Sequence, residues 1–141
     1  MRQRKAVTAN WSICLLLLFT VVELVGCNDT VTDHEVDAQI QKLTLQTGSS
    51  DLGSVSRHPQ IARSKSGVDA DWQITTSFHV GEYLETVKKR LNPDYRVVQQ
   101  SASELRLRRL LPGDSYDLHL AGSVAQGGQT LITVHFAARP D

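Results

Sequence analysis

Two tight turns near the C-terminus constrain the fold more than any other feature of the sequence. Pro112–Gly113 suits a type II turn, and residues 126–129, which contain two adjacent glycines, mark a second turn. If each turn closes an antiparallel hairpin, one face of the sheet collects apolar side chains: Leu105, Leu107, Leu118, Leu120, Val134 and Phe136. Because the two turns set their registers independently and agree on this face, the sequence predicts a sheet with one buried side.

The preceding segments supply the rest of this unit. Residues 72–79 alternate apolar and polar side chains, which is typical of a strand. Residues 80–91 change to a helical period, and Pro93 ends the helix. Its apolar stripe is formed by Val80, Leu84, Val87 and Leu91. Three further strands follow: residues 95–99, residues 105–111, and a long hairpin arm with its return at 115–124 and 130–138, which together count as the last strand.

We therefore predict an α+β fold for residues 71–141. It is a two-layer sandwich in which one helix covers a mainly antiparallel, four-stranded sheet of order β-α-β-β-β.

Residues 27–70 are poor in large apolar side chains, and Gly, Ser, Asp and Gln are frequent from residue 46 to residue 67. This composition predicts a flexible tether. A short helix over residues 33–45 is an alternative for part of it. Thr32 and Glu35 have capping-box spacing, and apolar residues recur at helical spacing at Val36, Ile40 and Leu43.

The N-terminal segment has the order of an export signal. A basic start at residues 1–5 leads into an apolar run at 13–22, which is too short to span a membrane, and then into Leu24–Val25–Gly26–Cys27. This motif resembles the lipobox of bacterial lipoproteins, and the resemblance covers residues 1–27. It implies a signal peptide of residues 1–26 that is removed, with lipid attached to Cys27. An ordinary secretory signal and an uncleaved anchor are the rival interpretations.

The resemblance also bears on location and composition. Asn28 follows the lipobox where Asp would favour inner-membrane retention, so we expect the outer membrane, facing the periplasm. Cys14 lies inside the signal, and lipid on Cys27 would leave no thiol for a disulfide. Beyond residue 26 the chain has 12 basic and 14 acidic residues, a balance that does not favour nucleic acid as a partner.

The same registers place polar side chains on the opposite face of the sheet. This candidate interaction face consists of Arg106, Arg108, Asp117, His119, Thr133 and His135. His119 and His135 face each other and could hold a metal if His79 or Asp117 joined them. A solvated face is the stronger interpretation, since antiparallel sheets commonly bury one side and expose the other to water.

No nucleophile elbow, zinc-protease helix or phosphate-binding loop occurs in the sequence. We therefore expect a non-enzymatic, membrane-anchored envelope lipoprotein without a cofactor, acting as a protein-interaction or assembly module. Its partners would be the membrane, through lipid, and another envelope protein. The alternative is a periplasmic ligand- or metal-binding module that uses the polar face. An enzyme is the least favoured of these classes.

Overall fold

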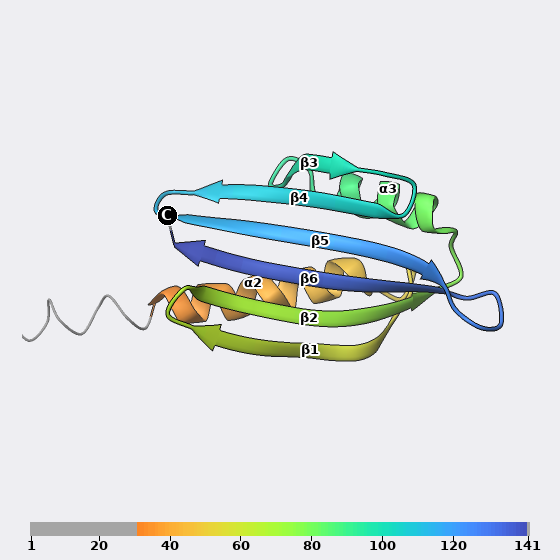
Figure 1. Ribbon diagram of the computed structural model, residues 1–141, viewed down its shortest axis with the longest axis horizontal. Helices are drawn as coiled ribbons and strands as arrows, with labels where there is room; N and C mark the ends of the chain where they lie inside the picture. The colour runs from red at the N-terminus through yellow and green to blue at the C-terminus, as the bar shows by residue number, and fades with distance from the viewer. Residues whose placement is uncertain (1–30, 141) are drawn as a thin grey trace, which may run out of the picture. The chain divides into compact units, whose positions relative to one another are not determined.

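The computed structural model describes residues 31–140, so the predicted signal and Cys27 lie outside the described residues. Nearly all described residues belong to one compact unit, which begins at Ala38 within helix α2. Figure 1 shows the elements in chain order. They are α2 (Val31–Thr47), β1 (Ser54–Ser64), β2 (Gly67–Thr76), α3 (Val80–Leu91), β3 (Arg96–Gln100), β4 (Glu104–Leu111), β5 (Asp114–Val124) and β6 (Thr130–Pro140).

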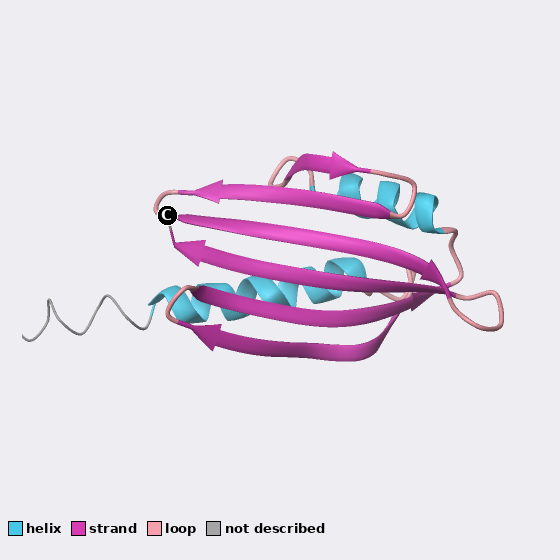
Figure 2. Ribbon diagram, in the orientation of Figure 1, coloured by secondary structure: helices cyan, strands magenta, loops and turns pink. Residues whose placement is uncertain are grey.

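The strands form one open sheet in the order β1-β2-β6-β5-β4-β3, in which every neighbouring pair is antiparallel (Figure 2). Both hairpin registers predicted from the turns are confirmed. Leu107 pairs with Leu118 across the first hairpin, and Leu118 pairs with Phe136 across the second. Gly113 in the first turn has φ +80°, a left-handed conformation that glycine adopts without steric cost.

One face of the sheet carries the core. All six apolar residues predicted to share a face are at most 1% exposed. Helices α2 and α3 lie on the same side of the sheet in Figure 2, and they bury Ile40, Leu43, Tyr83, Leu84 and Val87. The α+β class and the two-layer arrangement are therefore confirmed for the described residues.

Buried hydrogen bonds fix the end of α2 to its neighbours. The indole Nε1 of Trp72 donates to Thr47 Oγ1 at 3.1 Å, and the hydroxyl of Tyr83 donates to the Thr47 carbonyl at 2.7 Å. In turn, Thr47 Oγ1 donates to the Leu43 carbonyl at 2.8 Å. Thr47 therefore joins α2 to both β2 and α3. Within residues 31–140, no helix covers the opposite face of the sheet.

The predicted number of elements was wrong. The sheet has six strands instead of four, and two helices cover it instead of one. The helix left open at 33–45 is present as α2, and β1 together with the start of β2 occupies residues predicted to be tether. Strand β1 escaped detection because it is an edge strand with side chains exposed on both faces, so its sequence has no apolar alternation.

Candidate functional site

The face of the sheet away from the helices, here called the open face, carries all six residues predicted to share it. Arg106 pairs with His119, Arg108 with Asp117, and His119 with His135. Thr133 lies between Ala121 of β5 and Gln73 of β2 in the pairing, at the centre of the sheet. The hairpin turns are responsible, because they fix which side chains of β4, β5 and β6 point away from the core.

The strongest contact between β4 and β5 on this face joins Arg108 and Asp117. Arg108 Nε donates to Asp117 Oδ1 at 2.6 Å, and the two side chains are 50% and 38% exposed. This hydrogen bond raises the pKa of the Arg108 guanidinium above its ordinary value. At such exposure the pair orients both side chains more than it stabilises the fold, since solvated ion pairs contribute about 0–1 kcal/mol.

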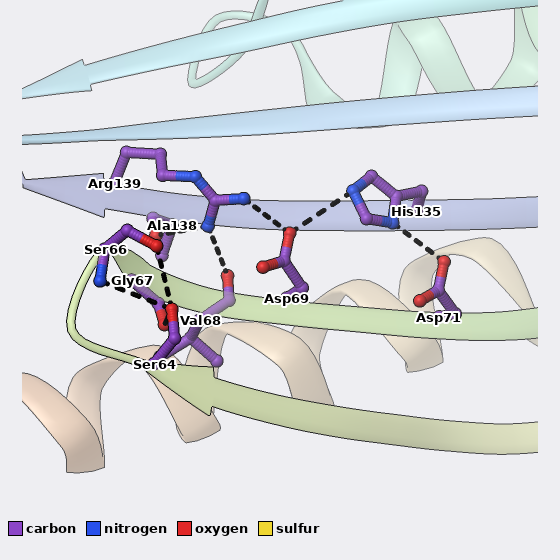
Figure 3. A network of polar contacts seen from close by, with 9 residues as sticks. All are labelled: Ser64, Ser66, Gly67, Val68, Asp69, Asp71, His135, Ala138 and Arg139. Carbon is purple, nitrogen blue, oxygen red and sulfur yellow. Dashed lines mark hydrogen bonds and ion pairs between the residues drawn. The ribbon is translucent and has the colours of Figure 1, made fainter.

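A second network joins β6 to β2 (Figure 3). His135 Nδ1 lies 2.7 Å from Asp71 Oδ1, and His135 Nε2 lies 3.5 Å from Asp69 Oδ1. Arg139 Nη2 donates to the same Asp69 oxygen at 2.6 Å, and Arg139 Nη1 donates to the Val68 carbonyl at 3.3 Å. Both ring nitrogens of His135 are thus directed at carboxylates on the neighbouring strand.

Sequence reasoning missed Asp69 and Asp71 as members of the open face. Asp69 was assigned to the tether, and neither aspartate entered the candidate face. A signal was present, because Val68 and Ala70 alternate with these aspartates and continue the buried pattern of Trp72. It was too short to be recognised without knowing that β2 pairs with β6.

His119 has a less defined environment than His135. Its Nε2 atom is buried and lies 3.4 Å from Glu104 Oε2, which is an ion-pair distance but not a hydrogen bond of normal geometry. A small rotation of the exposed Glu104 side chain would bring the two atoms into a hydrogen bond.

The histidines do not gather into a metal centre. His119 faces His135, as predicted, but His79 lies at the N-cap position of α3, beyond the end of β2 at Thr76, and its side chain makes no capping hydrogen bond. Across residues 31–140, no three His, Cys, Asp or Glu side chains are close enough together to hold a metal ion. The proposed third ligand, Asp117, is instead bonded to Arg108.

Two adjoining hollows lie on the open face. One of about 430 Å³ lies over β4, β5 and β6, and the other, of about 550 Å³, lies toward the edge formed by β3 and β4. Val98 and Arg108 line both. The first hollow is also lined by Arg106, Asp117, His119, His135 and Arg139. The open face is therefore a hollowed surface in which basic side chains predominate.

Comparison with known proteins does not assign the chain to a family. No family model and no curated protein matches the sequence. Among solved structures, the crystal structure of CalU16 from Micromonospora echinospora is similar, with a TM-score of 0.41 and 13% sequence identity. The matched region covers 62% of this chain and 73% of that chain.

Proposed function

We propose that this protein is a non-enzymatic bacterial envelope lipoprotein whose open face binds another envelope protein. The observation that carries the proposal is the asymmetry of the sheet. Helices cover one side, while the other side presents oriented ion pairs, two histidines and two hollows. A broad, hollowed and polar surface suits a protein partner, since interfaces combine charged rims with shaped recesses.

The anchor in this proposal is lipid on Cys27. The basic start, the short apolar run and the Leu24–Val25–Gly26–Cys27 motif support it. Several acyl chains on one residue give stable membrane attachment. Asn28 favours the outer membrane, facing the periplasm. Neither helix described within residues 31–140 is long and apolar enough to cross a membrane.

Most of the segment predicted to be a tether, residues 27–70, is occupied by helix α2 and strand β1. Helix α2 begins at Val31, so the described fold starts soon after Cys27. The proposal therefore does not require the domain to reach a distant partner. A partner in or near the same membrane is sufficient.

In-cell photo-crosslinking tests the proposed interface. A photo-crosslinking residue is placed in turn at Gln73, Ala121 and Thr133, which share the centre of the open face and take part in none of its ion pairs. Lys89, exposed on helix α3, is the control position. The full, exported protein is irradiated in the cell, and we expect one discrete adduct from the three open-face positions and none from Lys89.

Two results would count against this interface. Equal adducts from all four positions would indicate contacts without a preferred surface. No adduct from any position would favour the second candidate, a ligand-binding module, for which the specific observation is the hollow of about 430 Å³ lined by His119 and His135.

A further inference from the structure

We propose that the partner of the open face presents an acidic, extended segment, and that Arg96, Arg106 and Arg108 bind its carboxylates. These three residues are called the arginine cluster. The inference rests on the proposed function, because it names the chemistry of the partner, but it is tested by direct binding instead of crosslinking.

The arginine cluster has more positive charge than the fold neutralises. Arg96 pairs with Arg108 across β3 and β4, which places like charges directly opposite one another. Such opposition destabilises a strand pair. Arg106 lies two residues before Arg108, on the same face of β4. Asp117 is the carboxylate bound to the cluster.

Two of the three guanidinium groups are not used by the described part of the chain. Arg108 donates to Asp117 through Nε. Among residues 31–140, Arg96 and Arg106 have neither an ion pair nor a side-chain hydrogen bond, and both are exposed. Unpaired arginines set in a hollow are an attractive site for anions, because the planar guanidinium binds a carboxylate through two parallel hydrogen bonds.

Exposed apolar side chains stand beside these cations. Val98 is 57% exposed and Leu110 is 73% exposed, and both line the hollow of about 550 Å³ together with Arg96 and Arg108. A single exposed leucine needs no explanation. Two exposed apolar residues, Val98 and Leu110, within one basic hollow form a surface that matches a partner with both acidic and apolar side chains.

The spacing along β4 specifies the partner further. The open-face positions of β4 read Arg106, Arg108 and Leu110, at every second residue. Alternate side chains in an extended chain are about 6.6–6.8 Å apart, so a strand-like segment has the same spacing. We infer that the segment carries two acidic residues at alternate positions, followed by an apolar residue in the next such position.

The same observations disfavour a membrane surface as the occupant. Anionic lipid head groups would also attract arginine. However, the arginine cluster lines hollows, and a flat bilayer surface meets protruding side chains more readily than recessed ones. An extended peptide can enter such a recess.

The test uses the full chain, lipidated if Cys27 is modified, in non-ionic detergent. The probe is a fluorescein-labelled synthetic peptide in which Glu alternates with Ser and Leu follows in the next alternate position. Its control has the same composition with consecutive glutamates. The double variant Arg96→Glu and Arg106→Glu is compared with Lys65→Glu and Lys89→Glu, which makes the same charge change at exposed positions of the β1–β2 turn and helix α3.

We expect the first double variant to bind the alternating peptide at least tenfold more weakly, and the control double variant to bind it within twofold of the unmodified protein. The alternating peptide should also bind more tightly than the control peptide. If the glutamate variant does not fold, as judged by circular dichroism, Arg96→Gln with Arg106→Gln replaces it, and the same direction is expected.

Three outcomes would overturn the inference. They are equal losses in both double variants, equal binding of the two peptides, and arginine-dependent binding of phosphatidylglycerol vesicles in place of the peptide. A crosslink from Thr133 without peptide binding would reject the acidic segment while leaving the interface in place. Peptide binding without any crosslink would support the acidic segment and count against the proposed interface with an envelope protein.

Discussion

At the scale of single residues, polar groups in this protein have two separate uses. The buried contacts around Thr47 join α2 to β2 and α3, where an unsatisfied group would cost about 1–3 kcal/mol. The contacts of the open face are half exposed, so water screens them. Their main effect is to orient the side chains of Arg108, Asp117 and His135, which would serve the proposed interface more than the stability of the fold.

Tyr95 makes the stability of the fold sensitive to alkaline pH. Burial raises the pKa of Tyr95 to about 12, and the hydrogen bond from Gln39 opposes this rise only in part. The unfolded chain releases this proton near pH 10, so the stabilisation is complete below pH 10 and is lost as the pH rises toward 12. We expect Tyr95 to account for a fall of about 1 kcal/mol in the free energy of unfolding between pH 9 and pH 11.

Urea denaturation at several pH values measures this effect. The Tyr95→Phe variant should show a shallower fall between pH 9 and pH 11 than the unmodified protein. A remainder is expected, because burial also raises the pKa of Tyr83. An unchanged slope in the variant would contradict the assignment, whatever its effect on stability at neutral pH.

At the scale of elements, glycine positions report how closely the helices pack on the sheet. A Cβ atom on Gly122 of β5 would collide with Val80 at the start of α3 and would lie 3.1 Å from Ile132 Cδ1. A Cβ atom on Gly81, in the first turn of α3, would meet no atom within 4 Å. One glycine is therefore required by packing, and the other is replaceable.

These two glycines form a matched pair for mutation. Gly122→Ala should lower the free energy of unfolding by about 1–3 kcal/mol, because the added methyl group overpacks the contact with α3. Gly81→Ala should raise it by about 0.5–1 kcal/mol, since alanine favours the helix. Urea denaturation followed by circular dichroism measures both, and similar effects of the same sign would show that α3 does not pack as described.

Prediction at this scale depended on whether an element is half buried. Strands β4, β5 and β6 have one buried and one open face, so their sequences alternate and their turns fix the register. The predicted stripe of α3 is equally clear, and three of its four residues, Leu84, Val87 and Leu91, are buried. Strand β1 is exposed nearly throughout, and composition alone makes such an edge strand look like a linker.

At the scale of the whole molecule, the two sides of the sheet have different surroundings. The helices and one sheet face form the core, and the open face keeps its charges in water. The proposed lipid anchor would hold this two-sided domain at the membrane. It depends on Cys27, which precedes the described residues.

Replacing Cys27 tests the anchor. Cys27→Ser should abolish incorporation of labelled palmitate and move the protein out of the membrane fraction, because serine lacks the thiol that the lipobox modification requires. Cys14→Ser, inside the predicted signal, is the control and should change neither result. If the Cys27→Ser variant remains membrane-bound, an uncleaved anchor replaces the lipoprotein interpretation. If the wild-type protein incorporates no palmitate and is found in the soluble fraction, an ordinary secretory signal is favoured.

The sequence by itself determined the features that depend on short-range chemistry. Turn residues and alternation set the pairing of β4, β5 and β6, and with it the six predicted members of the open face. Tertiary structure decided the pairing of β2 with β6, which brings Asp69 and Asp71 to His135 and Arg139. It also added β3 beside β4, which creates the opposed Arg96 and Arg108. The β2–β6 pairing joins residues 54 to 70 positions apart, and no local turn specifies such a partner. Burial of the shared apolar face selects it.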